Sequence, residues 1–362
     1  MYGEHDYEVL TSAREGLQRQ EDHFGSKQRH DTDGYNIIPF GYCTYRNRSD
    51  DGKFAFNINT ISEKAIVSKF YPVFRFTNAN STFMAEFLNS SPRVKKKLSV
   101  LAVGTSQVVL SFEALKAAKF DLPCKDEQDK IAAFLECLNA RIENQRTLVV
   151  ALKKYKRGVV RTLLSPKRCS IKNVKWTTSR IGDIGTFIKG APLSKADISL
   201  DGTPFILYGE LYTTYSEVIS NVVRKTQASA DKQYYSQIGD VIIPTSGETP
   251  EEISTASCVM LPDIILAGDL NIYRCTQVDG RIMSYILNHV INDRIARIAQ
   301  GKSVVHVQAA EISKIEITYP DPFSQKTIIA ILAAISDRID QSNAELRLLH
   351  ELRKALLQKL FI

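Results

Sequence analysis

A long internal repeat constrains this chain more than any other feature. Residues 104–165 match residues 301–362 at a constant offset of 197, with no gap. A duplicated segment of this length indicates a chain built from two related halves. The identities at this offset include Gly104/Gly301, Ser106/Ser303, Pro123/Pro320, Gln128/Gln325, Ile131/Ile328, Ala133/Ala330, Leu135/Leu332, Arg141/Arg338, Ile142/Ile339, Leu152/Leu349 and Leu163/Leu360.

A shorter match lies upstream, shifted by two residues. Residues 84–89 resemble residues 283–288, and both segments have the pattern of a short amphipathic helix. Further upstream, residues 1–80 and 166–280 show no alignment. The chain therefore alternates between divergent units and constant segments, with two of each.

Each constant segment has the apolar spacing of a coiled coil, with steps of three and four over about five heptads. We expect two helices of roughly 37 residues, about 55 Å long at 1.5 Å per residue. Acidic residues near 126–129 and prolines at 123 and 322 mark their starts. The expected packing residues are Ile131, Leu135, Leu138, Ile142, Val149 and Leu152 in the first copy, and Ile328, Leu332, Ile335, Ile339, Leu346 and Leu349 in the second. The same stripe continues through Tyr155, Val159 and Leu163, and through Leu352, Leu356 and Leu360.

Connectivity favours antiparallel pairing of these helices, because residues 166–319 leave the end of the first and return to the start of the second. The heptad pattern is interrupted at Gln145 and Ser342, both near a helix midpoint. In an overlapped antiparallel pair, these two residues would meet in a central polar layer that fixes the register. Alternatively, each faces solvent independently. A further alternative packs each helix on the core of its own domain instead of on the other helix.

The chain of 362 residues is too long for one compact core. We predict an α+β fold in which two strand-rich globular units are separated by two long helices, packed as an antiparallel coiled coil with pseudo-two-fold symmetry. The predicted parts are residues 1–122 (first globular unit), 123–165 (central spacer helix), 166–319 (second globular unit) and 320–362 (C-terminal spacer helix). Short strands are predicted at 240–244, 264–267 and 270–275, and within 35–45 and 65–76.

Composition and motifs exclude several classes of protein. The longest apolar run, 328–335, has eight residues, well short of the ~20 that a membrane-spanning helix needs, and the acidic start does not resemble a secretion signal. The six cysteines include no C-x-x-C pair, which argues against zinc or disulfides and fits a reducing cytoplasm. We find no phosphate-binding loop, dinucleotide fingerprint, nuclease cluster, nucleophile elbow or histidine pair with metal-ligand spacing. These features favour a non-catalytic binding protein without a metal.

Duplex DNA is the ligand that this layout suits. The net charge of +7 favours a polyanionic partner. Two dissimilar units held apart by a stiff rod suit two separated sites on a stiff duplex, and 55 Å corresponds to at most roughly 16 base pairs. Candidate phosphate contacts are Arg46, Arg48, Lys53, Lys95, Lys96 and Lys97 in the first unit, and Lys189, Lys195 and Lys302 in the second. Candidate base contacts are Thr44, Asn47, Thr245 and Ser246. For each residue, a merely solvated role is the alternative.

These features resemble the DNA-specificity subunit of type I restriction–modification enzymes. The duplicated layout, which covers nearly the whole chain, is more specific than any single motif. The segments that carry the resemblance are 127–132 and 324–329, the loops at Gly104 and Gly301, residues 176–184 and 204–212 in the second unit, and residues 45–51 and 66–74 in the first.

The resemblance implies a non-catalytic subunit. Each globular unit would be a target-recognition domain that reads one part of a bipartite, asymmetric site in double-stranded DNA. The helices would act as a spacer and as the docking surface for two methyltransferase subunits, which motor–nuclease subunits join. S-adenosylmethionine, Mg²⁺ and ATP would belong to these partners, so no cofactor is expected on this chain.

The first unit departs from the pattern. Residues 176–184 precede Gly301 by roughly 120 residues, whereas 103 residues precede Gly104. By comparison of the two repeats, we expect the first unit to lack roughly 25 residues at its front. Two other functions remain open: a duplicated scaffold that joins protein partners without reading DNA, and an unrecognised nuclease or methyltransferase.

Overall fold

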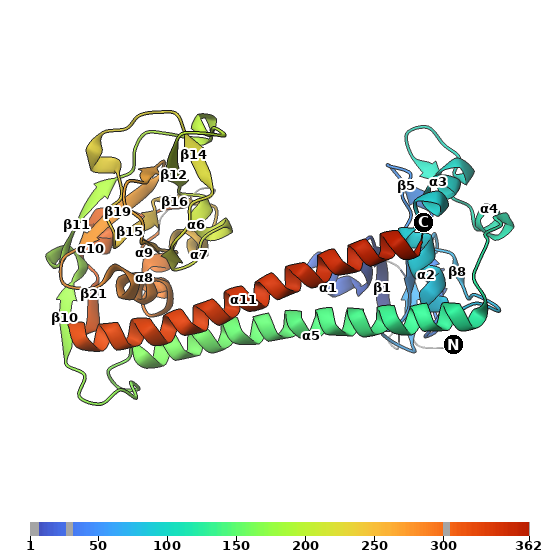
Figure 1. Ribbon diagram of the computed structural model, residues 1–362, viewed down its shortest axis with the longest axis horizontal. Coiled ribbons are helices and arrows are strands. Elements are labelled where there is room, and N and C mark those ends of the chain that lie inside the picture. The colour runs from blue at the N-terminus through green and yellow to red at the C-terminus, as the bar shows by residue number, and fades with distance from the viewer. Residues whose placement is uncertain (1–6, 27–31, 300–304, 362) are drawn as a thin grey trace. The chain divides into compact units, whose positions relative to one another are not determined.

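The computed structural model of the chain describes residues 7–26, 32–299 and 305–361. It divides into two compact units (Figure 1). Unit 1 comprises Met1–Thr147 and Asn343–Ile362, and unit 2 comprises Leu148–Ser342. The division runs through the middle of both long helices, so each unit contains one half of each helix and its own set of strands.

The two constant segments form the long helices that the sequence predicts. Helix α5 spans Lys125–Leu163 and helix α11 spans Pro322–Leu360, with 39 residues in each. At the offset of 197, the two helices begin and end at equivalent residues. Pro322 opens α11, where a missing amide hydrogen costs no helical hydrogen bond. Asp126 and Glu127 lie in the first turn of α5, where they complement the helix dipole.

The helices pack together in an antiparallel sense within each unit. In unit 1, Leu138 and Ile142 near the start of α5 form a buried cluster with Leu349 near the end of α11. In unit 2, the main core contains Val160 from the end of α5 and Ile328 from the start of α11.

The core of unit 2 also includes residues from the globular part. In unit 1, a second cluster joins Leu135 of α5 and Leu357 of α11 to Phe83 of the globular part. Each helix therefore packs on the other helix, as predicted. Each also packs on a domain core, which the sequence left open as an alternative to helix pairing.

The buried stripe departs from the predicted spacing at the same place in both helices. Tyr155 and Leu352, which are equivalent at the offset of 197, are 60% and 49% exposed, whereas Val160 and Leu357 are buried. The end of the predicted stripe also departs, because Leu360 is 38% exposed. A straight helix drifts relative to a strict seven-residue repeat, so the buried face moves around the helix.

The two polar residues in the stripe are buried. Gln145 is 9% exposed and Ser342 is 2% exposed. Burial rules out the alternative in which both face solvent. Their direct contact in a central layer stays a prediction.

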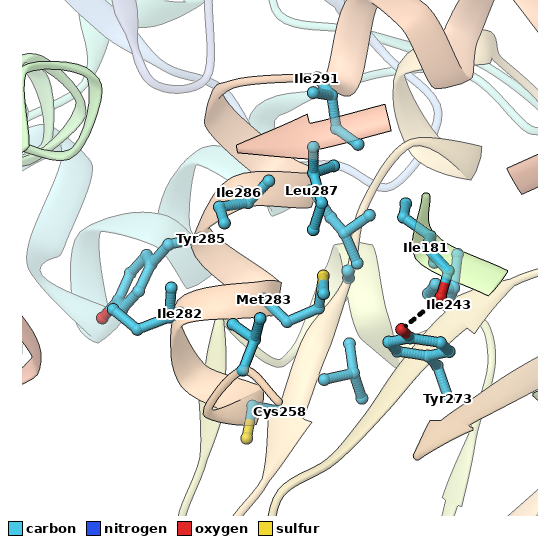
Figure 2. Close-up of a cluster of buried hydrophobic side chains, with 14 of the residues drawn as sticks. Ile181, Ile243, Cys258, Tyr273, Ile282, Met283, Tyr285, Ile286, Leu287 and Ile291 are labelled. Atoms are coloured by element: carbon cyan, nitrogen blue, oxygen red, sulfur yellow. Dashed lines mark hydrogen bonds between the residues drawn. The ribbon is translucent and has the colours of Figure 1, made fainter. Parts of the chain in front are cut away.

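The core of unit 2 is built on a five-stranded sheet of order β11–β19–β15–β17–β13. Helix α8 (Gly280–His289) packs on this sheet, and Figure 2 shows Met283 of this helix pointing toward Ile243 and Tyr273. The strands are β11 (Gly185–Lys189), β13 (Val218–Ile219), β15 (Asp240–Pro244), β17 (Ser257–Val259) and β19 (Leu270–Cys275). Strands β15 and β19 begin and end at the predicted residues.

Smaller sheets complete unit 2. Strand β12 (Thr203–Leu207) lies between β14 (Arg224–Thr226) and β18 (Ile265–Ala267), and it pairs with β18 in parallel. Two antiparallel pairs join β10 (Trp176–Arg180) to β21 (Glu316–Pro320), and β16 (Ser246–Gly247) to β20 (Val305–His306).

Unit 1 has a smaller set of sheets. Strand β4 (Cys43–Tyr45) lies between β6 (Phe56–Ile58) and β8 (Val73–Phe74), and β5 (Arg48–Ser49) pairs with β9 (Val108–Val109). A four-stranded sheet of order β2–β1–β7–β3 contains β1 (Glu8–Ala13), β2 (Gly16–Arg19), β3 (Asn36–Ile37) and β7 (Ala65–Val67).

Strand pairing extends the repeat into the segments where the two sequences do not align. Strand β4 pairs with β6 and β8 as β15 pairs with β17 and β19, and β5–β9 matches β16–β20. The parallel pair β1–β7 matches β12–β18. Helix α2 (Ser81–Ser90) matches α8 at an offset of 199, and α4 (Phe112–Ala117) and α10 (Ala309–Ser313) begin at equivalent residues. The two halves therefore share one architecture built from dissimilar sequences.

The remaining elements are short. The helices are α1 (Gln20–Phe24), α3 (Pro92–Leu101), α6 (Glu210–Thr213), α7 (Pro250–Ile253) and α9 (Asn292–Ile298), and the 3₁₀ turns are η1 (Ile181–Asp183), η2 (Lys195–Asp197) and η3 (Lys232–Tyr234).

Candidate nucleic-acid interface

Two of the predicted base contacts, Asn47 and Thr245, lie in equivalent loops of the two units. Asn47 links β4 to β5 in unit 1, and Thr245 links β15 to β16 in unit 2. Arg48 and Ser246 then occupy the same register position in the two matching strand pairs. Two dissimilar sequences therefore present different side chains from the same place in the fold.

A cationic hollow lies beside this loop in unit 1. Its volume is about 420 Å³. The charged side chains on its walls are Arg14, Glu15, Arg46, Arg48, Asp50 and Lys53. The walls of the hollow therefore carry four basic and two acidic side chains. Arginine is well suited to such a site because its planar fork can bind a phosphate through two hydrogen bonds.

Asp51 organises the basic groups at this hollow. Its carboxylate contacts Arg14 at 2.8 Å and Lys53 at 3.6 Å. A hydrogen bond from the Ser49 hydroxyl, followed by the Lys53 backbone amide and the charge of Arg14, lowers the pKa of Asp51 to about 2. The carboxylate therefore stays ionised at neutral pH and holds Arg14 and Lys53 beside each other.

An exposed aromatic ring lies among these cations. Phe70 is 52% exposed, and the Arg48 guanidinium lies 5.3 Å from the centroid of its ring. The Lys69 ammonium lies 5.7 Å from the same ring. Basic groups combined with an exposed ring are typical of nucleic-acid surfaces, because cations bind phosphates and rings stack on bases.

Sequence reasoning missed Arg14 and Phe70. Arg14 lies in the tight turn between β1 and β2, where Gly16 has a φ of +138°. The sequence signal for Arg14 was an arginine close to a turn glycine, between two short strands. The neighbouring basic and aromatic residues at 69 and 70 were the signal for Phe70.

The lysines of α3 divide into two groups. Lys95 and Lys96 line a second hollow of about 360 Å³ together with Lys53, so three predicted residues come together there. Lys97 points elsewhere: its ammonium donates to the backbone carbonyl of Lys119 and lies 5.2 Å from the ring of Phe120. Lys97 therefore holds a backbone segment, and we leave it out of the proposed contacts.

Thr44 lies inside the domain. It is fully buried in β4, and its hydroxyl has no hydrogen-bond partner among the described residues. All three residues of β4 are buried, so this side chain does not reach a ligand at the surface. Asn47 is half-buried, and its buried amide oxygen also has no partner in the described part of the chain.

In unit 2, the predicted residues are less concentrated. Lys189 ends β11 and pairs with Asn271, which places it at the same end of the sheet as the half-buried Thr245. Ser246 is buried, and its hydroxyl donates to the Asp269 carboxylate at 3.0 Å, so it serves the fold. Lys195 is exposed at the start of η2, and Lys302 lies outside the described residues.

A buried ionic network elsewhere in unit 2 connects α5 to the globular part. The Glu217 carboxylate contacts Lys156 at 2.8 Å and His289 at 2.6 Å. Burial by itself would raise the pKa of Glu217, but the hydrogen bond with His289 and the charge of Lys156 outweigh it and lower the pKa to about 2. The three side chains are at most 14% exposed, which fits a structural role.

The part of the chain that the structure describes was not found to hold a metal-binding cluster or a membrane-spanning helix. No group of three or more His, Cys, Asp or Glu side chains there is arranged to hold a metal ion. Among the helices of these residues, none has the length and apolar character needed to cross a membrane. All six cysteines are free thiols.

The sequence of the chain matches a family of known proteins. A family model described as the type I restriction modification DNA specificity domain matches residues 4–152 and 173–350. A search of curated proteins found no match.

Two solved structures share the fold. The crystal structure of a type I restriction–modification S subunit from M. genitalium is 16% identical, with a TM-score of 0.58, over 99% of this chain and 89% of that one. A structure reported for complex assembly and conformational transition of the type I R-M system is 17% identical, with a TM-score of 0.57, over 92% of this chain and 84% of that one.

Proposed function

Because the chain belongs to the type I restriction–modification DNA specificity family, as a non-catalytic specificity subunit, we propose that it reads a bipartite, asymmetric site in double-stranded DNA. Unit 1 reads one half-site and unit 2 reads the other. The observation that carries this proposal is the pair of equivalent loops, Arg46–Asn47 and Thr245, which place dissimilar side chains at the same position of one repeated fold.

The first reader is built around the cationic hollow. Arg14, Arg46, Arg48 and Lys53 bind phosphates, which supplies affinity and orientation without sequence information. Asn47 is the proposed base contact, since its amide nitrogen can donate a hydrogen bond to an acceptor on a base edge. Lys95 and Lys96 extend the phosphate contacts from the neighbouring hollow.

The second reader uses fewer charges. Lys189, Lys195 and Lys302 are the proposed phosphate contacts, and Thr245 is the proposed base contact. The divergence of residues 166–280 from residues 1–80 means that the two half-sites differ in sequence, so the complete site is asymmetric.

The long helices serve as spacer and docking surface. Each is a continuous helix of 39 residues that contributes to both units. In our proposal, their packing residues, including the buried Gln145 and Ser342, fix the spacing of the half-sites. Two methyltransferase subunits dock on this part of the chain and motor–nuclease subunits join them in the cytoplasm. S-adenosylmethionine, Mg²⁺ and ATP bind to those partner subunits.

The phosphate contacts are tested with the chain assembled with the methyltransferase subunits of its own system. Methylome sequencing of the host with and without the gene supplies the DNA target. Replacing Arg46 and Arg48 with alanine is expected to lower affinity about tenfold and to reduce the salt slope by about 1 for each lost phosphate contact. The matched control replaces Lys64 and Lys116, two exposed lysines of unit 1 outside the hollow and outside the long helices. Equal losses in both variants would contradict the assignment of the hollow.

The division of labour is tested by domain exchange. Replacing residues 166–319 with the second unit of another specificity subunit is expected to change the methylated sequence in one half-site only. An unchanged sequence combined with altered choice of protein partners would instead support the scaffold function.

A further inference from the structure

The two units differ in how their sheet edges are covered. In unit 2, the segment β10–η1–β11 covers two edges. Strand β11 pairs with the outer edge of β19 over five residues, and β10 pairs with β21 over five residues. No described residue of unit 1 forms a counterpart of β10, η1 or β11.

This covering segment contributes to the core of unit 2. Ile181 and Ile184 are each 1% exposed, and the backbone carbonyl of Ile181 accepts a hydrogen bond from the Tyr273 hydroxyl at 2.8 Å (Figure 2). The ring of Phe187 lies 4.6 Å from the ring of Tyr273. Tyr273 on β19 is fully buried as a result.

The equivalent edge in unit 1 is the outer edge of β8. Strand β8 ends the sheet order β6–β4–β8, and no strand in the described ranges pairs with its outer side. Its Phe74, the counterpart of Tyr273, is half-buried. The ring of Phe74 lies 5.3 Å from Phe76 and 5.2 Å from Phe112, in an apolar cluster that is only partly covered.

The second edge in unit 1 is residues 119–123, the counterpart of β21 at the offset of 197. The segment is not in a strand pair, and Leu122 is 39% exposed where its counterpart Tyr319 is 5% exposed. Phe120 is half-buried where its counterpart Ile317 is 2% exposed.

Residues 119–123 are nevertheless held as β21 is held. In unit 2, the Arg294 side chain donates to the carbonyl of Glu316 at 2.7 Å, and Gln325 donates to the carbonyl of Pro320 at 2.8 Å. The equivalent bonds exist in unit 1, where Lys97 donates to the carbonyl of Lys119 and Gln128 to the carbonyl of Pro123. Residues 119–123 are therefore positioned like β21, and among the described residues unit 1 has no strand that pairs with them as β10 pairs with β21.

We propose that unit 1 binds a strand–turn–strand polypeptide in trans at these two edges. Its occupant is a separate polypeptide with the chemistry of residues 176–189: a first strand that is mostly polar, an apolar turn, and a second strand that pairs with β8. Backbone hydrogen bonds supply affinity in this mode of recognition, and the side chains facing the sheet supply specificity.

The second strand needs glycine beside the ring of Phe74, because Gly185 pairs with Cys275, two residues after Tyr273, and lies against the Tyr273 ring. In unit 2, a Cβ on Gly185 would lie 2.5 Å from the ring of Tyr273 and 2.6 Å from the carbonyl of Arg274. The equivalent ring of Phe74 imposes the same limit, so a larger residue at this position prevents pairing.

The experiment uses the full chain and a labelled peptide of residues 173–190, with the Gly185→Val peptide as the matched control. Saturable binding is expected by fluorescence anisotropy, with at least a tenfold loss for the control peptide. Amide hydrogen exchange is expected to slow at residues 73–76 and 119–123 and to stay unchanged at 316–320. Leu122→Asp in the chain is expected to weaken binding, whereas Val100→Asp, at a residue 77% exposed in the same unit, leaves it unchanged.

A fusion keeps the test decisive if the free peptide is too weak a ligand. Residues 173–190 joined ahead of Met1 by a flexible linker are expected to give the same protection at 73–76 and 119–123. Several results would overturn the proposal: no new protection in either format, amides at 119–123 already protected in the chain alone, or equal binding of both peptides. Self-association of the chain that Leu122→Asp abolishes would assign the edge to a second copy instead, and would also overturn it.

Discussion

Gln128 and Gln325 are equivalent residues of the repeat, and they make the same structural contacts in the two units. In unit 2, the Gln325 side chain donates to the carbonyl of Pro320 and accepts from the amide of Asp279 at 2.8 Å. This joins the start of α11 to the first turn of α8. Gln128 makes the same two bonds in unit 1, where it accepts from the amide of Asn80 at 3.0 Å. Both glutamines are 3% exposed.

Gln325→Leu is expected to lower the unfolding free energy of unit 2 by about 2–4 kcal/mol. The substitution leaves a buried amide hydrogen and a buried carbonyl without a partner. Trp176, the only tryptophan in the chain, pairs with Pro320 and reports on this region by fluorescence during denaturation. Gln341→Leu, at an exposed residue of the same helix, is the control, and an equal loss in both variants would contradict the role of Gln325.

The buried network at Glu217 predicts a pH dependence of stability. The pKa of Glu217 in the folded chain is about 2, below the usual glutamate pKa of 4.5. The stabilisation is therefore complete above pH 4.5 and is lost as the pH falls from 4.5 through 2. The amount is on the order of 2–3 kcal/mol.

Denaturant titrations at pH 5 and pH 3 measure this effect. Asp279 and Asp321 also have lowered pKa values in unit 2, so the comparison is made between the wild-type chain and Glu217→Gln. The wild type is expected to lose more stability between the two pH values than the variant. Parallel losses would show that Glu217 does not carry the dependence.

Among single residues, sequence reasoning located the charged loops and missed the burial of individual side chains. Arg46, Arg48 and Lys53 come together at one hollow, as a run of basic residues near a turn suggests. Thr44 and Ser246 are hydrophilic residues in the same stretches, yet both are buried. Which way a short strand turns its side chains depends on its register with β6 or β20, which composition does not reveal.

At the scale of elements, the long helices were predictable and the strands of unit 1 were only partly so. A stripe of apolar residues over about five heptads, present in both copies of the repeat, fixes α5 and α11, because few other structures bury such a pattern. The expected stretches 35–45 and 65–76 each contain two short strands separated by a loop. Strands of two or three residues depend on partners far along the chain, so local patterns cannot place them.

The equivalence of β4 with β15 and of β8 with β19 was not visible in the sequence. These strands share pairing and register but not residues, because a buried strand accepts many apolar side chains of suitable size. The element-scale resemblance between the two units therefore exceeds the resemblance of their sequences.

Ile328→Ala in α11 tests the packing of this helix on the core of unit 2. Ile328 is fully buried in that core, so the substitution creates a cavity and is expected to cost about 2–4 kcal/mol. Ile331→Ala on the same helix is the control, because Ile331 is 37% exposed and its loss is expected to cost less than about 1 kcal/mol. Similar losses in thermal or denaturant unfolding would show that α11 does not pack on this core as described.

At the scale of the whole molecule, the chain combines duplication with divergence. The constant segments preserve the helices and the contacts that seat them, such as those of Gln128 and Gln325. The divergent segments change the loops at Asn47 and Thr245 while the central strands of the two units, β6–β4–β8 and β17–β15–β19, keep the same order. This separation allows the DNA sequence that is read to change without loss of the fold or of the proposed docking surface.

The most direct test of two-site reading varies the gap between the half-sites. The chain, assembled with its methyltransferase subunits, is titrated with duplexes that carry both half-sites of its methylated target and gaps that differ by one base pair. The account predicts one preferred gap, with affinity falling at least tenfold when a base pair is added or removed. Equal affinity for all gaps, or full affinity for one half-site alone, would contradict the claim that the two units read DNA at a fixed spacing.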